Sequence, residues 1–216
     1  MIVQPRPPAR ARLHAFADRR LSYLRALEHE LIPTLELKGR MLDFGGGRKA
    51  GYVPLLNFNG PSDSLNIDMR IEPTILHDAN TPFPIADATY DTIISFNTLE
   101  HVRRDEFALG ELVRILKPGG TIHIVVPFLY RVHGSPSDYH RHTAFWWEAA
   151  LDLLGIPPEH SRIEPMMWGR LTSGFSFLEY TRLRFLRRLP LWFDLAIRGT
   201  GDEVYPLGYY IKGTKP

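Results

Sequence analysis

A short apolar segment that runs into a cluster of glycines is the feature that most constrains the fold of this chain. Residues 40–44 read Arg-Met-Leu-Asp-Phe, and Gly45, Gly46 and Gly47 follow directly, with Gly51 close behind. Glycine can adopt positive φ and allows a ligand to approach the backbone closely. A strand that ends in such a turn and feeds a helix is a common nucleotide-binding device. The segment therefore predicts a strand whose carboxyl end carries a ligand site.

The rest of the chain alternates short apolar runs with helical patterns. Apolar residues at three- and four-residue spacing predict an amphipathic helix over 16–31. The predicted strands are 40–44, 64–69, 74–77, 92–96, 121–126, 162–168 and 207–212. The predicted helices are 105–116, 144–154, a short one at 54–58, and 175–197 with a break at Pro190, while 80–89 is a predicted loop. This alternation predicts an α/β fold with a mostly parallel seven-stranded sheet, helices on both faces and right-handed connections.

The predicted organisation is an N-terminal arm and helix over 1–39 followed by one domain over 40–216. A helical elaboration is expected at 169–203, before the last strand. The composition is that of an ordinary soluble protein, with 44% hydrophobic and 23% charged residues. The net charge of +2 gives no global field for nucleic acid, and the absence of cysteine excludes disulfides and thiolate metal sites. No signal peptide or membrane-spanning run is visible, which favours a cytoplasmic protein.

Six short motifs follow one another in a characteristic order. They are Asp-Phe-Gly-Gly-Gly (43–47), Asn-Ile-Asp (66–68), His-Asp-Ala-Asn-Thr-Pro-Phe-Pro (77–84), Tyr-Asp (90–91), Leu-Glu-His-Val (99–102) and Arg-Ile-Leu-Lys-Pro-Gly-Gly (114–120). In this order and spacing they resemble the class I S-adenosylmethionine-dependent methyltransferases, in particular the methyltransferase type 11-like branch. The resemblance covers residues 40–154 and implies a Rossmann-like sheet and a methyl-transfer activity that uses S-adenosyl-L-methionine.

The resemblance also implies roles for individual residues. Gly45, Gly46 and Gly47 would let the backbone approach the methionine part of the cofactor, and Asp43 would order that turn or contact the amino group through water. Asp68, at the end of the second predicted strand, is placed by its spacing to accept hydrogen bonds from both ribose hydroxyls. The remaining cofactor-binding positions are Met69, Asp78 with the backbone of Ala79 at the adenine, and Asn97 on the methyl-transfer side.

Two other interpretations of the glycine turn stay open. Lys49 occupies the third glycine position of the usual motif, and Gly45, Gly47 and Ala50 also satisfy the pattern of nicotinamide-dependent oxidoreductases. Asp43 argues against that enzyme class. A carboxylate there would lie near the negatively charged pyrophosphate of a dinucleotide, whereas it is compatible with a cofactor that carries a sulfonium and an ammonium group. A catalytically inactive regulatory or scaffold subunit is the third alternative.

A second polar cluster, residues 133–143, follows the fifth predicted strand at the edge where open α/β sheets bind ligands. Its sequence is His-Gly-Ser-Pro-Ser-Asp-Tyr-His-Arg-His-Thr, which resembles a segment of methyltransferases in surface-polysaccharide pathways. It predicts either an acceptor-side lid or a structural loop that caps the next helix. A metal site is the third alternative, against which the spacing of His140 and His142 argues, because they alternate rather than lie one helical turn apart.

For an oxygen acceptor of high pKa, a general base within hydrogen-bond reach would help the transfer. The candidates, in order, are His140, His101 and Asp138, and the candidate substrate-binding residues are His133, Tyr139 and Arg141. The expected acceptor is a small molecule or a carbohydrate, which includes a surface-polysaccharide or lipid-linked one. Basic and aromatic residues over 175–197 are compatible with peripheral membrane contact, although a packed helix is favoured. We expect a monomer or homodimer that does not bind nucleic acid.

Overall fold

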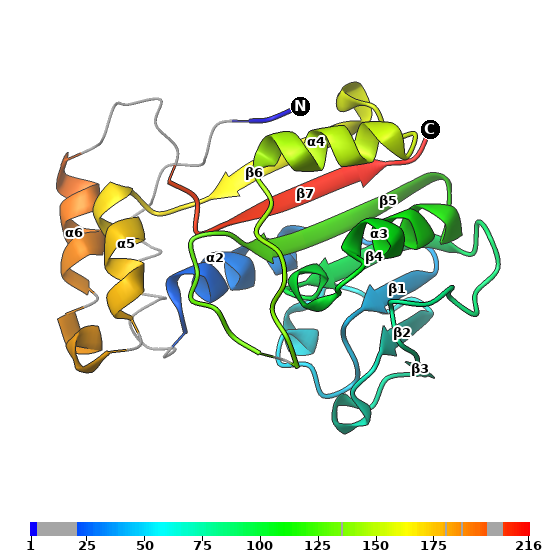
Figure 1. The fold of residues 1–216 in the computed structure, drawn as a ribbon, viewed down its shortest axis with the longest axis horizontal. Helices are drawn as coiled ribbons and strands as arrows, with labels where there is room; N and C mark the ends of the chain where they lie inside the picture. The colour runs from blue at the N-terminus through cyan, green and yellow to red at the C-terminus, as the bar shows by residue number, and fades with distance from the viewer. Residues whose placement is uncertain (4–20, 135, 180, 187, 198–204) are drawn as a thin grey trace.

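The computed structural model describes residues 1–3, 21–134, 136–179, 181–186, 188–197 and 205–216. Seven strands form one sheet in the order β3-β2-β1-β4-β5-β7-β6 (Figure 1). The strands are β1 (Met41–Phe44), β2 (Ser62–Asn66), β3 (Ile75–Leu76), β4 (Tyr90–Phe96), β5 (Leu116–Pro127), β6 (Ser161–Met166) and β7 (Gly208–Thr214). The first five run parallel, and β7 is antiparallel to both of its neighbours. The prediction of a mostly parallel, Rossmann-like seven-stranded sheet is therefore confirmed.

Helices cover both faces of the sheet because side chains alternate between the faces along each strand. On one face Leu42, Phe44 and Ile93 pack in the core with helices α3 and α4, which lie in front of the sheet in Figure 1. On the other face Met41 and Ile94 pack with helix α2. The helices are α2 (Tyr23–Leu31), α3 (Asp105–Ile115), α4 (Ala144–Leu153), α5 (Arg170–Phe175) and α6 (Arg188–Ile197). The short 3₁₀ helices are η1 (Ile32–Thr34), η2 (Val53–Leu55), η3 (Met69–Ile71), η4 (Leu99–His101), η5 (Pro158–His160), η6 (Ser176–Leu178) and η7 (Arg182–Leu186).

Several element boundaries differ from those predicted. Helix α2 begins after Ser22, whose side chain caps it, and the predicted start at residue 16 lies outside the described residues. Strand β2 ends at Asn66, so Asp68 lies in the turn that follows. The predicted turn over 117–120 lies within the bounds of β5, where Tyr90 pairs with Leu116 and Thr92 already pairs with Thr121. The four residues in between therefore bulge out of the ladder, which agrees with their role as a stop signal.

The helical elaboration before the last strand is present as α5, η6, η7 and α6, which lie together at one end of the molecule (Figure 1). Pro190 lies in the first turn of α6 and does not break it, since proline is tolerated there. Large apolar side chains of this region face solvent, among them Phe177, Phe185 and Trp192. Within the described residues, no helix combines the length and apolar character needed to cross a membrane.

Candidate functional site

The glycine turn lies at the carboxyl end of β1, as predicted, and is packed on three sides. Gly45 has a φ of 87°, and a Cβ there would collide with the side chain of Thr98, just after β4. A Cβ on Gly46 would collide with the carboxylate of Asp43, and one on Gly47 with the carbonyl of Ile71. The turn can therefore pass between β4 and η3 only without side chains. The turn lies at the carboxyl end of β1, at the edge of the sheet where ligands bind in this fold class.

Asp43 is a buried carboxylate directly beneath this turn. The hydroxyl of Tyr52 donates a hydrogen bond to Asp43 Oδ1 across 2.6 Å. Burial raises the pKa of Asp43 to about 7, and the hydrogen bond from Tyr52 only partly opposes this. A buried carboxylate with one neutral partner favours a nearby positive charge, because the ionised form is poorly solvated. The predicted role of Asp43 in ordering the turn is compatible with this geometry.

Asn66, the last residue of β2, links the turn to Asp68. Its side-chain amide donates to the carbonyl of Gly45, and its Oδ1 accepts a hydrogen bond from the backbone N–H of Asp68 at 2.9 Å. The Asp68 carboxylate is held by the backbone N–H and the guanidinium of Arg70, which lower its pKa to about 2. The Arg70 side chain is 88% exposed, so this ion pair gives way at little cost when another donor arrives.

The third predicted cofactor position lies at the end of β3, beside the end of β2. Asp78 Oδ1 accepts hydrogen bonds from the backbone and side chain of Asn80, and these lower its pKa. Met69, in η3, exposes 71% of its surface. An exposed apolar side chain and a carboxylate at adjoining strand ends are the combination that a purine ring would contact. The strand pairing Asn66↔Leu76 brings these two ends together.

Lys49, at the position of the missing third glycine, is accommodated without conflict. Its backbone N–H donates to the carbonyl of Ile71, and its exposed side chain forms an ion pair with Glu72 at 2.7 Å. The turn and η3 are thereby tied together on the outer surface. Lys49 therefore takes the place of the usual third glycine while its side chain is paired with Glu72 on the outer surface.

Asn97, the residue after β4, faces the N-terminal helix. It adopts a φ of 50°, and its side-chain amide donates to Glu28, which is fully buried in α2. Arg25 also bonds to Glu28, at 2.6 Å. Burial raises the pKa of Glu28, against the effect of Arg25 and Asn97. Helix α2 is therefore fixed over the end of β4, and its position beside the glycine turn could not be read from the sequence.

The histidine-rich segment folds back along the residues that follow β4. The carbonyl of Ser137 contacts His101 Nδ1, and the N–H of Tyr139 donates to the carbonyl of Glu100. Further along, His140 Nε2 lies 3.4 Å from Asp105 Oδ1, and His142 Nε2 lies 2.6 Å from Asp105 Oδ2. The structure thus brings together every predicted catalytic and substrate-binding residue, namely His101, His133, Asp138, Tyr139, His140 and Arg141. Their individual roles stay predictions.

An ion pair between Asp138 and Arg141 stabilises the conformation of this segment. Both guanidinium ends of Arg141 donate to Asp138, and the N–H of His133 donates to Asp138 Oδ2 at 2.9 Å. Burial alone would raise the pKa of Asp138, but these donors lower it to about 2. A carboxylate so paired is a poor base, and Arg141 would have to exchange this partner for an acceptor anion.

Glu100 is the functional candidate that the sequence did not single out. It is only 2% exposed, and neither of its carboxylate oxygens has a hydrogen-bond partner among the described residues. Burial raises its pKa to about 8. The Leu-Glu-His-Val motif was the available signal, although a charge at a helix start explains a glutamate there equally well. Tyr52, Asn66 and Glu28 carried no motif, because their contacts arise only from the fold.

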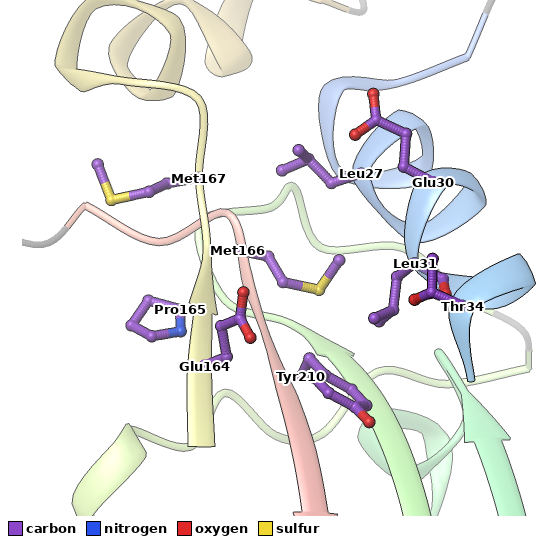
Figure 2. Close-up of a pocket in the computed structure, with 9 residues that line it drawn as sticks. All are labelled: Leu27, Glu30, Leu31, Thr34, Glu164, Pro165, Met166, Met167 and Tyr210. Atoms are coloured by element: carbon purple, nitrogen blue, oxygen red, sulfur yellow. The ribbon is translucent and has the colours of Figure 1, made fainter. Parts of the chain in front are cut away.

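A pocket lies elsewhere, between α2 and strands β6 and β7. Figure 2 shows Leu27 and Leu31 of α2 facing Met166 and Tyr210 across it, with Glu164 beside them. None of the residues that line it belongs to the predicted cofactor or acceptor site. The candidate site is the edge of the sheet formed by the glycine turn and the histidine-rich segment.

Comparison with known proteins agrees with this geometry. Residues 54–124 match the family model described as a methyltransferase domain. No curated protein matches the sequence significantly. A Haloferax volcanii complex between a methyltransferase and its activator Trm112 has a chain that is 18% identical, with a TM-score of 0.58 and coverage of 95% of this chain and 93% of that one. A Thermotoga maritima S-adenosylmethionine-dependent methyltransferase is 17% identical, with a TM-score of 0.58 and 94% coverage of both chains.

A third structure is longer than this chain. Phosphoethanolamine N-methyltransferase 2 of Haemonchus contortus, solved with S-adenosyl-L-methionine, is 16% identical with a TM-score of 0.57. The match covers 88% of this chain but only 52% of that one, so this chain spans about half of its length. At such identities the likeness establishes the fold alone. The chain therefore has the fold of S-adenosylmethionine-dependent methyltransferases, and its residues 54–124 match the methyltransferase domain model, in agreement with its motifs.

Proposed function

We propose that this protein binds S-adenosyl-L-methionine and transfers its methyl group to a small-molecule or carbohydrate acceptor. The observation that carries the proposal is the arrangement of three carboxylates, Asp43, Asp68 and Asp78, at the ends of three neighbouring strands around one glycine turn. A cofactor with an ammonium group, a sulfonium, a ribose and an adenine has one complementary group for each of these features. The glycine turn, where Thr98, Asp43 and Ile71 leave no room for side chains, fits the methionine part of the cofactor.

In this proposal each carboxylate binds a different part of the cofactor. Asp43, buried under the turn, favours the cationic end of the cofactor. Asp68, released from Arg70, accepts from the ribose hydroxyls, while Asp78 and Met69 hold the adenine. The bound cofactor would supply an activated methyl group, so the protein's main task is to position the acceptor in line with it.

His140 is the strongest candidate for a base toward an oxygen acceptor. Asp105 Oδ1 lies 3.4 Å from its Nε2, and a carboxylate beside an imidazole orients the ring. Asp138 is less suited, because Arg141 and the His133 N–H lower its pKa to about 2, against the effect of burial. We expect His140→Ala to lower kcat by a factor of about 10²–10⁴ while leaving cofactor affinity unchanged. Unchanged kcat would remove His140 from this role, and His160→Ala, at an exposed histidine, is the matched control.

A thermal-shift experiment tests the cofactor directly. A ligand that binds only the folded protein raises the unfolding midpoint by mass action. We expect a shift with S-adenosylhomocysteine and none with NAD. A shift with NAD alone would support the nicotinamide-dependent oxidoreductase, and no shift with either would support the inactive scaffold. Methylation assays with tritiated cofactor over sugars, phenols, amines and carboxylates then identify the acceptor.

The predicted cytoplasmic location, membrane contact and oligomeric state stay predictions. The exposed Phe177, Phe185 and Trp192 support a peripheral contact of the α5–α6 region. Co-sedimentation with anionic liposomes at low salt tests it, and the absence of binding would end it.

A further inference from the structure

We propose that Glu100, His101 and His133 form a binding site for one divalent transition-metal ion of the zinc class. One carboxylate oxygen and one nitrogen from each ring lie within 4.8 Å of one another. Two histidines and one carboxylate are a common ligand set for such ions, and they leave positions open for water or an acceptor oxygen. The proposal does not depend on the cofactor assignment.

The Glu100 carboxylate is the first argument for an ion at this place. Both of its oxygens are buried and lack a hydrogen-bond partner among the described residues. A buried polar group without a partner destabilises the fold, and an ionised one does so more strongly. His101 Nε2 lies 3.6 Å from Glu100 Oε1, beyond hydrogen-bond distance. A cation between the carboxylate and the rings would satisfy Glu100 in a way that no described residue does.

The orientation of the two histidines is the second argument. A metal-binding imidazole commonly donates its other N–H to a carbonyl or carboxylate, which fixes the tautomer. His101 Nδ1 contacts the carbonyl of Ser137, which leaves Nε2 facing Glu100. His133 Nδ1 lies 3.2 Å from Asp138 Oδ2 and 3.3 Å from the carbonyl of Arg131, which likewise leaves the Nε2 lone pair free. Both rings thus have the outer-sphere partners that a metal site requires.

The geometry needs only a small adjustment to close around an ion. Zinc binds nitrogen and oxygen at about 2.0–2.2 Å, so ligand atoms in a tetrahedral site lie roughly 3.3 Å apart. The Glu100–His101 distance of 3.6 Å is close to this value, and the two imidazole rings lie 4.8 Å apart at 78°. His133 is on the segment that folds back over η4, so a small movement of this segment would bring its ring nitrogen to ligand distance.

A second group, Asp105, His140 and His142, also lies within metal-binding reach. Its atoms are already engaged with one another, however. His142 Nε2 is 2.6 Å from Asp105 Oδ2, and His140 Nε2 lies between Asp105 and the carbonyl of Arg103. Asp105 Oδ1 also accepts from the N–H of Glu106 at 2.9 Å. This second group is therefore internally satisfied, whereas Glu100 is not.

The sequence alone could not predict this site. His101 and His133 are 32 positions apart, and only the return of the histidine-rich segment along η4 brings them together. The alternation of His140 and His142, which argued against metal, concerns the other group. As a metal ligand His101 would not serve as the free base, which leaves that role to His140.

Metal titration of the purified, tag-free chain tests the proposal. After removal of metal with EDTA, we expect isothermal titration with Zn²⁺ to show one saturable site per chain. His133→Ala and Glu100→Gln should weaken Zn²⁺ binding at least tenfold, because each removes one of three ligands. His142→Ala and the exposed His160→Ala should retain it. Circular dichroism and thermal melting without metal show whether each variant is folded. If Glu100→Gln does not fold, the Zn²⁺ titration of His133→Ala decides, because His133 is partly exposed and its replacement should disturb the fold less.

Two results would overturn the proposal. One is the absence of saturable Zn²⁺ and Co²⁺ binding to the wild-type chain. The other is loss of binding in His142→Ala with retention in His133→Ala, which would place the ion at Asp105. The S-adenosylhomocysteine thermal shift, measured in the EDTA-treated protein, reports on the cofactor site separately. Failure of the metal site and failure of the proposed function can therefore be told apart.

Discussion

The Tyr52 hydroxyl donates a hydrogen bond to Asp43 Oδ1 across 2.6 Å, and these two buried side chains pack beneath the glycine turn. Glu28 and Arg25 of α2 act on Tyr52 from the other side, and the pKa of Tyr52 is raised well above its usual value, first by burial and then by Asp43. Asp43, the first of the proposed cofactor-binding residues, is therefore also a buried titratable group. Its ionisation links the stability of the fold to pH, and under the proposed function it also links cofactor binding to pH.

The stability of the protein should fall as pH rises from about 4 to about 7 because of Asp43. Its pKa is raised from the ordinary value of 3.8 to about 7 in the folded chain. In this window only the folded chain holds the proton, so raising the pH favours unfolding, and above it both states are ionised. The contribution is on the order of 4 kcal/mol. Urea unfolding across this range should show a flatter profile for Asp43→Asn than for the wild type.

Asp63→Asn is the control for that profile, since Asp63 is paired on the surface with Arg40. Its unfolding curve should keep the wild-type dependence on pH. Identical profiles for the wild type and Asp43→Asn would contradict the assignment of a raised pKa to Asp43.

Replacement of Asp68 should weaken cofactor binding. A hydrogen bond to a charged group contributes about 1.5–3 kcal/mol, so Asp68→Ala should raise the Kd for S-adenosylhomocysteine by roughly 10- to 100-fold. Isothermal titration calorimetry measures this Kd. Arg70→Ala is the matched control, because it frees the carboxylate and should leave the Kd within about threefold of the wild type. An unchanged Kd in Asp68→Ala would show that the ribose is bound elsewhere.

The glycine turn should tolerate alanine at one end and not at the other. Gly45 combines a φ of 87° with contact to Thr98, so Gly45→Ala should lower the free energy of unfolding by about 1–3 kcal/mol. A Cβ at Gly51 meets no atom within 4 Å, and Gly51→Ala should change stability by less than about 1 kcal/mol. Chemical denaturation compares them, and equal losses would mean that the contact with Thr98 is not limiting.

Asp138 and Arg141 should behave as one unit. Their bidentate contact is largely buried, so the single variants Asp138→Asn and Arg141→Met should each destabilise, and the double variant should lose less than the sum. We expect a coupling energy of about 1–3 kcal/mol in a double-mutant cycle. The exposed pair Lys49 and Glu72 should couple by less than about 1 kcal/mol. Additive losses at Asp138 and Arg141 would contradict the pairing.

Much of the fold could be predicted because local chemistry and tertiary structure agree. The buried strand 92–96, the helix at 105–116 and the glycine turn at 45–47 each carry a pattern that only one element satisfies, and all three are confirmed within a few residues. Asp68 was predicted at the end of a strand over 64–69, whereas β2 ends at Asn66 and Asp68 lies in the turn that follows.

The remainder depended on contacts between distant segments. Asn97 was predicted to line the methyl-transfer side, but nothing in its neighbourhood indicated that its amide would bond to Glu28, 69 positions away. Arg141 was predicted to bind an acceptor anion, while the structure gives it Asp138 as a partner. Pairing of this kind is set by the path of the loop, which residue types and spacing do not determine.

The place of β7 has a consequence for the order in which the protein is assembled. This strand separates β5 from β6, although β6 precedes it by more than 40 residues in the chain. During synthesis the parallel strands β1 to β5 can pair as they emerge. Strand β6 meets only the short bridge from Ile2 to Ile163 on one side, and its other edge has no partner until residues 208–214 have been made. The nascent chain must therefore carry an unpaired strand edge on β5 and on β6, and both are sites where premature association with other chains can begin.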